Sequence, residues 1–179
     1  MTLYTVGHSN RTLEQLIAIL KAHNIDMIAD VRGGRAGSRT FPHFNKENLM
    51  ISLPTVGIQY KHFPDLGGRR SVNKTIDPEI NKEWRVPAFK NFADYAYTSS
   101  AFDIALSDLI SDGANTRVAY MCSEAVPWRC HRSLITDYLV MLHHIEITHL
   151  LGEKQTMVGK PHTFAKVVGA KIAYPVNTI

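Results

Sequence analysis

Apolar residues recur along this chain with two spacings, which predict alternating strands and helices. Short runs rich in β-branched and aromatic residues, ended by Gly, Pro or charged positions, indicate five strands, at residues 3–6, 27–31, 58–63, 117–122 and 145–151. An i, i+3, i+4 spacing and capping residues predict helices near 13–20, 45–53, 89–96, 100–113 and 129–143. Thr12 with Gln15 forms a candidate capping box, Asn45 is a candidate N-cap, and Gly113 is the expected end of the fourth helix.

Strands that alternate with helices predict an α/β fold in a single domain, with a mostly parallel sheet of about five strands and helices on both faces. Residues 1–152 carry this pattern without a linker or an internal repeat, and residues 153–179 form a basic C-terminal extension. Within the extension, residues 171–174 have the pattern of an added edge strand. Its four lysines against Glu153 alone account for three of the four net positive charges, and a solvated extension is favoured over a nucleic-acid-binding arm.

The amino-acid composition is that of a globular protein. A chain of 179 residues with 45% apolar side chains can bury a sizeable core, which excludes disordered and low-complexity classes. Two cysteines cannot form a disulfide framework, which indicates a reducing compartment. The apolar runs are too short to span a bilayer, and the first residues lack the pattern of a secretory signal. We therefore expect a cytoplasmic protein without membrane association, and we assign it no cofactor and no metal.

The arginines are clustered, whereas the lysines are not. Eight of the ten arginines fall in four short segments that follow the first four predicted strands: Arg11; Arg32, Arg35 and Arg39; Arg69 and Arg70; Arg129 and Arg132. If the strands are parallel, these segments meet beyond one edge of the sheet, where ligands bind in such folds. Guanidinium groups suit phosphate or carboxylate. For any single arginine, a helix cap, an ion pair or a solvated position is the more common explanation.

The densest chemistry lies in residues 122–132. Cys122 ends a predicted strand and Cys130 begins a predicted helix, where free N–H groups and nearby positive charge favour a thiolate. Glu124 suits a general acid or base, or a partner for Arg132. Three interpretations stay open: a reactive thiol, a zinc site formed by Cys122, Cys130 and His131 with His8 or Glu124, and two structural cysteines.

The spacing argues against the more familiar cysteine motifs. No Cys-x2-Cys is present, and adjacent Cys130 and His131 point in different directions at a helix start. The zinc-deaminase pattern lacks its downstream Cys-x2-Cys. The phosphatase-type Cys-x5-Arg loop fails because position 128 is Trp and Arg129 comes one residue too late.

Residues 5–11 provide the second candidate. His8 follows the first strand, with Gly7 permitting an unusual turn. A lone loop histidine is usually solvated, so His8 gains significance only if it faces a cysteine. Asp30 with Arg32 is most simply a structural ion pair at the end of the second strand.

Together these segments resemble the domain-of-unknown-function family 488, above all through the pattern Cys-x-Glu-x-x-Pro-x-x-Cys-His-Arg at residues 122–132. The resemblance extends from about residue 3 to 151 and implies a single α/β domain whose paired cysteines suggest an enzyme without an established reaction. Its segments include Ser38, Tyr60, Gly67 and Gly68. By resemblance, the candidate site residues are His8, Arg32, Arg39, Cys122, Glu124, Cys130, His131 and Arg132.

The sequence thus predicts a thiol-dependent enzyme with an arginine-lined site for an anionic substrate. Cys130 is the expected reactive thiol, Cys122 its partner, and Glu124 and His8 the groups that transfer protons. The substrate-binding candidates are Arg32, Arg39, Ser38, Arg129, His131, Arg132, Tyr60, Gly67 and Gly68. The expected partner is a small anionic molecule or nucleic-acid phosphate. Two alternatives remain: a non-catalytic nucleic-acid-binding module, and a metal-binding regulator that uses Cys122, Cys130 and His131.

Overall fold

Six strands form the central sheet of the protein, whose computed structural model describes residues 1–177. The order is β3-β2-β4-β1-β5-β6. The first five strands are parallel to their neighbours, and β6 pairs antiparallel with β5. The predicted α/β class is therefore confirmed. The strands are β1 (Thr2–Gly7), β2 (Met27–Asp30), β3 (Gln59–His62), β4 (Val118–Cys122), β5 (Glu146–Leu150) and β6 (Thr156–Val158).

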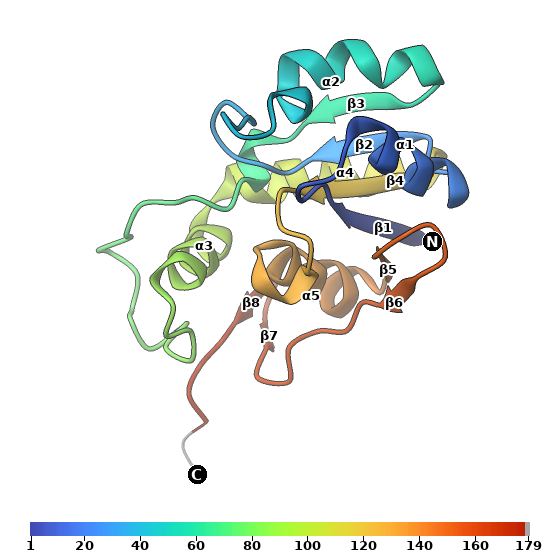
Figure 1. Ribbon diagram of the computed structural model, residues 1–179. Helices are drawn as coiled ribbons and strands as arrows, with labels where there is room; N and C mark the ends of the chain where they lie inside the picture. Colours follow the sequence, from blue (N-terminus) through green and yellow to red (C-terminus); the bar gives the residue numbers. More distant parts are fainter. Residues whose placement is uncertain (178–179) are drawn as a thin grey trace.

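Helices cover both faces of the sheet. On one face, α1 and α2 pack on the strands, and on the other face lie α3, α4 and α5. Figure 1 shows α2 on the opposite side of the strands from α3 and α5. The bounds are α1 (Leu13–Ala22), α2 (Lys46–Ser52), α3 (Pro87–Thr98), α4 (Ser100–Asn115) and α5 (Arg132–His143), with 3-10 turns η1 (Pro42–Phe44), η2 (Pro54–Val56), η3 (Pro64–Leu66) and η4 (Pro127–Arg129).

The predicted helix ends are partly confirmed. The capping box of Thr12 and Gln15 is present. The side chain of Asn45 does not cap α2, because its Oδ1 accepts a hydrogen bond from the Ser38 N–H group at 2.7 Å. Gly113 does not end α4: the helix continues to Asn115, and a Cβ at Gly113 would lie 2.3 Å from Leu3 Cδ2. Glycine is needed there for close packing of the helix on β1, not for termination.

The prediction that α5 begins at Arg129 or Cys130 is wrong. The turn η4 comes first, Cys130 has an extended backbone, and the helix begins at Arg132. Pro127 starts η4, and the chain bends again before α5 because Cys130 leaves the helical region. Cys130 therefore lies on a short linker that points its side chain back toward the end of β4.

The C-terminal extension is packed onto the protein rather than solvated throughout. Its edge strand in the main sheet is β6, whereas the predicted strand at 171–174 forms β8 (Lys171–Ala173), which pairs with β7 (Lys166–Val168) in a separate two-stranded sheet. The next residue, Tyr174, is fully buried and donates a hydrogen bond to Asp137 on α5 at 2.6 Å. Burial of these apolar side chains attaches the extension to the α3–α5 layer.

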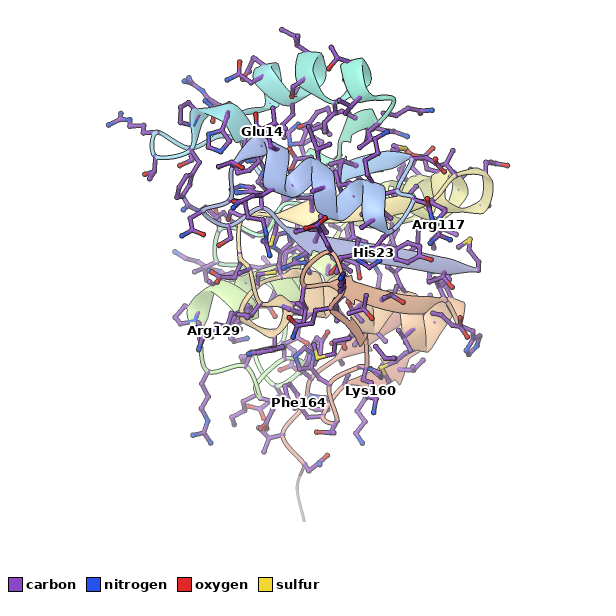
Figure 2. All side chains as sticks on the ribbon, turned by 45° about the vertical axis from the view of Figure 1, so that its right-hand side comes forward. Glu14, His23, Arg117, Arg129, Lys160 and Phe164 are labelled. Carbon is purple, nitrogen blue, oxygen red and sulfur yellow. The ribbon has the colours of Figure 1, made fainter. Side chains whose placement is uncertain are left out.

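The parallel strands point their carboxyl ends toward one side of the molecule. Figure 2 shows Arg129 on this side, at the opposite end of the strands from His23 and Arg117, which lie near the amino ends of β2 and β4. Among residues 1–177, no helix has both the length and the apolarity needed to cross a membrane.

Candidate active site

A cavity of about 1210 Å³ lies beyond the carboxyl ends of β1, β2 and β4. Five segments form its walls: residues 8–10 after β1, residues 32–38 and 41 after β2, residues 68–69 after β3, residues 86, 88 and 89 at the start of α3, and residues 122–125 and 129–131 after β4. Three residues of the first two segments have positive φ angles, namely Ser9 (50°), Gly34 (58°) and Ala36 (45°). Such conformations are costly for Ser and Ala and are concentrated at binding sites, where the surrounding structure imposes them.

Both cysteines line this cavity as free thiols in direct contact. The two Sγ atoms are 3.2 Å apart, and Cys130 is the more exposed of the pair, at 9% against 3% for Cys122. Arg132 Nε donates to Cys122 Sγ at 2.9 Å and to Cys130 Sγ at 3.2 Å. The backbone N–H groups of Arg132 and Glu124 point at Cys130 Sγ and Cys122 Sγ, at 3.4 and 3.2 Å. Four N–H contacts therefore converge on two sulfur atoms.

Arg132 is a buried cation without a carboxylate partner. Its side chain is 1% exposed, and its other donors bind Thr5 Oγ1 at 2.9 Å and the Glu124 carbonyl at 2.6 Å. Among the described residues, no Asp or Glu forms an ion pair with it. Burial alone would lower the pKa of Arg132, but the charges and hydrogen bonds of the two sulfurs raise it. The electrostatic partner of this guanidinium is thus the cysteine pair.

The two thiols have opposite pKa shifts. Burial raises the pKa of Cys130, but the hydrogen bond from Cys122 and the charge and N–H groups of Arg132 outweigh burial and lower it to about 6. Burial and the same sulfur–sulfur hydrogen bond raise the pKa of Cys122 well above its ordinary value. These opposite shifts favour a single proton on the pair near neutral pH, held by Cys122 rather than by Cys130.

His8 and Arg32 belong to a second buried network. Arg32 Nε and Nη2 donate to the two carboxylate oxygens of Asp30 at 2.9 and 2.7 Å, and Nη2 also donates to the Phe44 carbonyl at 2.7 Å. His8 Nδ1 donates to the Ser9 carbonyl at 2.9 Å, so Nε2 accepts from Arg32 Nη1 at 3.2 Å. Burial lowers the pKa of His8 to about 4, which keeps the ring neutral at pH 7.

This network also holds Tyr60, whose hydroxyl donates to Asp30. Tyr60 lies outside the residues that line the cavity. Arg32 lines the cavity, but Asp30 neutralises its charge at the end of β2. These residues support the cavity wall: Asp30 is the counter-ion of Arg32, and His8 Nε2 is occupied by the hydrogen bond from Arg32 Nη1.

The glycine and histidine candidates form tight contacts at the cavity wall, where Gly68 and His131 line the cavity and Gly67 does not. A Cβ at Gly67 would lie 2.4 Å from Gly33 Cα, and one at Gly68 would lie 2.6 Å from His131 Nδ1. His131 Nε2 donates to the Val31 carbonyl at 2.7 Å, and burial lowers the pKa of His131 to about 4. A neutral His131 therefore connects the start of α5 to the end of β2.

The remaining candidates differ in their access to the cavity. Arg129 and Glu124 are exposed, line the cavity and have no side-chain hydrogen bond or ion pair within residues 1–177. Ser38 lines the cavity, but its Oγ accepts from the Thr40 and Phe41 N–H groups at 3.1 and 3.4 Å. Arg39 is exposed and does not line the cavity.

Two lining arginines were not among the predicted site residues. Arg35 and Arg69 are exposed and line the cavity beside Gly34 and Gly68, without a partner in the described part of the chain. Their position in the glycine-containing loops after β2 and β3 was the available signal. Only the tertiary structure separates them from Arg39, which lies in the same loop after β2 as Arg35.

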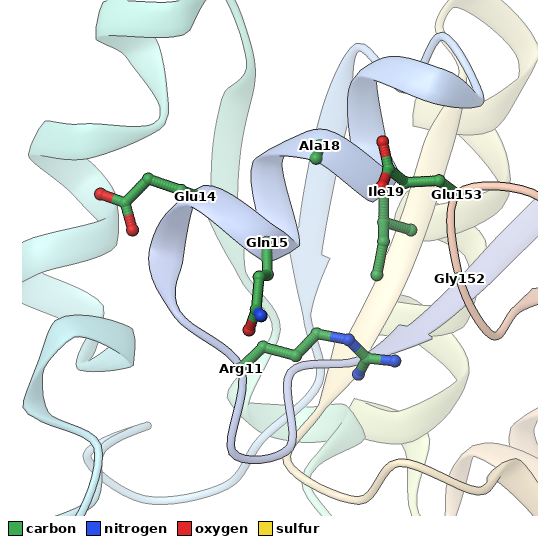
Figure 3. Close-up of a pocket in the computed structure, with 7 residues that line it drawn as sticks. All are labelled: Arg11, Glu14, Gln15, Ala18, Ile19, Gly152 and Glu153. Carbon is green, nitrogen blue, oxygen red and sulfur yellow. The ribbon is translucent and has the colours of Figure 1, made fainter.

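Arg11 does not join the other arginine segments at the cavity. Its Nη1 and Nη2 donate to the carbonyls of Gly7 and Leu151, at the ends of β1 and β5. Figure 3 shows Arg11 in a second hollow, of about 470 Å³, between α1 and residues 152–153. Its charge thus lies beside the sheet. The pKa of Arg11 is lowered mainly by burial and, to a smaller extent, by the nearby charge of Arg132.

The predicted alternative of a metal site is not supported by the geometry. Within residues 1–177, no three His, Cys, Asp or Glu side chains converge as a metal-binding group. In particular, His131 Nε2 is bound to Val31 rather than directed at Cys122 and Cys130.

Comparison with protein families gives one match that covers most of the chain. The family model described as domain of unknown function DUF488 matches residues 12–139, which include the whole cysteine motif but not His8. Comparisons with curated proteins and with solved structures gave no match.

Proposed function

The chain belongs to the DUF488 family, whose description assigns no reaction, and from the geometry of its cavity we propose that it is a thiol-dependent enzyme for an anionic substrate. Cys130 is the nucleophile, and arginines at the cavity wall bind a phosphate, sulfate or carboxylate group. Cys122 holds the shared proton. Glu124 is the general acid or base, because its carboxylate is on the cavity surface.

The observation that carries this proposal is the buried Arg132 guanidinium. An unpaired charge in a protein interior is strongly unfavourable, so a buried arginine requires an anion. The groups in contact with Arg132 are two sulfurs, a hydroxyl and a carbonyl, and of these only a sulfur can ionise near neutral pH. A thiolate on the more exposed sulfur satisfies this requirement and also provides a nucleophile at the cavity surface.

The substrate class follows from the arginines that the fold leaves free. Arg35, Arg69 and Arg129 come from three different segments, and each lines the cavity without an internal partner among residues 1–177. A cavity of about 1210 Å³ is large enough for a small molecule with more than one charged group. A single acidic lining residue, Glu124, opposes this positive charge.

The first test is the pH dependence of alkylation at each cysteine, measured by peptide mass spectrometry on the folded protein. We expect Cys130 to react with a midpoint near 6. Cys122 should react only at higher pH, and the unfolded chain should show two ordinary thiols. If both cysteines stay inert until the protein unfolds, the thiol hypothesis is wrong.

The second test concerns the anion. Phosphate, sulfate or a small dicarboxylate should slow Cys130 alkylation in a saturable way, and Arg69→Gln or Arg129→Gln should weaken this protection by about tenfold each. Arg39→Gln is the matched control, because Arg39 is exposed in the same region but does not line the cavity. A nucleic-acid-binding module would instead bind oligonucleotides with a steep salt dependence that survives Cys130→Ser.

A further inference from the structure

The function proposed above uses Cys122 only as the holder of a proton, yet its position suits a second role. Its sulfur is in contact with Cys130 Sγ at 3.2 Å, and both side chains line the same cavity. Cys122 ends β4, whereas Cys130 lies on the linker between η4 and α5, so the two thiols come from different segments of the chain that meet at the cavity. A mixed disulfide on Cys130 would thus have a second thiol beside it.

We propose that Cys122 and Cys130 form a reversible disulfide, and that the protein exchanges electrons with acidic low-molecular-weight disulfides through this pair. This inference rests on the proposed function, because it needs the Cys130 thiolate and the free arginines of the cavity. It adds a reaction type and a substrate class to the site.

The reaction has two steps, which balance in atoms and electrons. The Cys130 thiolate attacks one sulfur of a disulfide R–S–S–R, forms a Cys130–S–S–R bond and releases R–S⁻. Cys122 then transfers its proton to that thiolate and attacks Cys130 Sγ, which breaks the mixed disulfide and releases the second R–S⁻. Two electrons pass from the protein pair to the reagent, so that the protein gains one disulfide and the products are R–SH and R–S⁻.

Arg132 determines whether the dithiol or the disulfide form of Cys122 and Cys130 is favoured in the folded protein. In the reduced protein the thiolate is the anion beside the guanidinium, but a disulfide is neutral, so oxidation leaves Arg132 buried without a counter-ion. A buried charge that has lost its partner destabilises the folded state and raises the unfolding equilibrium constant by ~10² to 10⁴-fold. The loss of chain entropy that a short disulfide loop imposes on the unfolded state offsets about 10²-fold of this.

The reduced protein should therefore be the more stable form, which is the opposite of the usual effect of a disulfide. A dithiol that is stabilised by folding makes its disulfide a strong oxidant. Arg11 lies close enough to Arg132 for the charge of Arg132 to lower the pKa of Arg11. Repulsion between the two guanidinium groups therefore further destabilises the oxidised form.

The preference for acidic disulfides follows from Arg35, Arg69 and Arg129 at the cavity wall. Attraction by a basic cavity raises the encounter rate of anionic reagents by ~10-fold or more at low salt. The reaction rate should therefore decrease from oxidised glutathione, which carries carboxylates, to the uncharged hydroxyethyl disulfide and to the cationic cystamine. Arg129→Gln should reduce this selectivity, and Arg39→Gln should not.

The experiment begins with the reduced full chain, incubated with a large molar excess of oxidised glutathione, because a strongly oxidising pair forms its disulfide only under mass action. The sample is quenched with acid and analysed by mass spectrometry. We expect the loss of two hydrogens, assigned to a Cys122–Cys130 disulfide by peptide mapping. Cys122→Ser should instead accumulate the glutathione adduct on Cys130. Urea unfolding of the reduced and oxidised wild-type chains should then show the reduced form to be more stable, by about tenfold in the unfolding equilibrium constant.

Each other outcome overturns a defined part of the argument. A stable glutathione adduct on wild-type Cys130 refutes the disulfide proposal but leaves the thiolate enzyme intact. An oxidised form as stable as the reduced form, or more stable, refutes the role of Arg132. If Cys130 is alkylated rapidly at pH 7 but glutathione disulfide gives neither product, only the redox proposal fails; if it resists alkylation too, both proposals fail.

Discussion

At the scale of single residues, the site depends on an arginine that the protein interior surrounds completely. Arg132 contacts two sulfurs, the Thr5 hydroxyl and the Glu124 carbonyl, which come from β1, β4 and the loop after it. By contrast, Arg32 has a carboxylate partner, Asp30, and is neutralised by it. These two buried arginines thus differ in their partners, because Arg32 has a carboxylate, whereas Arg132 contacts two sulfurs, a hydroxyl and a carbonyl.

Arg132→Met tests this difference directly. Methionine keeps much of the volume but removes the charge and the N–H donors, so the midpoint of Cys130 alkylation should rise from about 6 toward its ordinary value of 9.0. The measurement is the alkylation profile of the folded variant, with circular dichroism as the check on folding. Arg129→Met is the matched control because Arg129 is exposed, and it should shift the midpoint by less than about half a unit. A folded Arg132→Met protein with an unchanged midpoint would contradict the assignment.

At the scale of elements, the end of β1 and the loop after β4 must approach each other closely. Backbone pairing continues beyond the sheet, since the N–H groups of His8 and Ser9 donate to the carbonyls of Cys122 and Ser123 at 3.0 Å. A Cβ at Gly7 would lie 1.8 Å from the Glu124 carbonyl oxygen, which is itself an acceptor for Arg132. Glycine at the end of β1 thereby permits the loop position that holds the buried guanidinium.

We expect Gly7→Ala to destabilise the protein and to alter the thiol. The added methyl group must displace the backbone around Glu124, which should lower the free energy of unfolding by about 1–3 kcal/mol and raise the Cys130 alkylation midpoint. Urea unfolding and the alkylation profile measure the two effects. In Gly152→Ala the nearest atom to the new Cβ is 3.9 Å away, so this control should change the free energy of unfolding by less than about 0.5 kcal/mol.

At the scale of the whole molecule, the fold buries several titratable groups that respond to acid in the same direction. Burial lowers the pKa values of His8, His131 and His149 to about 4. These rings stay neutral in the folded protein below pH 6.5, whereas the unfolded chain protonates them. The unfolded state therefore binds more protons between pH 6.5 and 4, and stability falls as the pH decreases through this window. Cys130 acts in the same sense, because its lowered pKa stabilises the fold at high pH, and this contribution is lost as the pH falls through about 6.

The free energy of unfolding should therefore decrease steeply between pH 6.5 and 4, with a slope of up to about 4 kcal/mol per pH unit from the three histidines. Urea unfolding at a series of pH values measures the slope. His149→Gln keeps a side chain able to bind Thr5 and should reduce the proton uptake by about one. A stability that is flat from pH 7 to 5 is incompatible with neutral buried histidines.

Much of the architecture could be predicted from the sequence because it depends on local patterns. The five parallel strands follow from short apolar runs between helical spacings, and parallel strands necessarily place their following loops at one edge. For that reason the segments around Arg35, Arg69, Cys122 and Cys130 could be expected to converge. The start of α5 could not be placed, since η4 and the extended backbone at Cys130 interrupt a pattern that local spacing treats as continuous.

Only the tertiary structure decided which charges are free and which are used. Arg11 binds strand-end carbonyls, Arg32 binds Asp30, and Arg39 does not line the cavity, although all three follow strands of the sheet as Arg129 does. The contacts around the thiols also depend on Thr5, whose hydroxyl binds Arg132 although the two residues are 127 positions apart in the chain. Electrostatic energies in a protein interior are set by distance and burial, and neither quantity is encoded in the local pattern of residues.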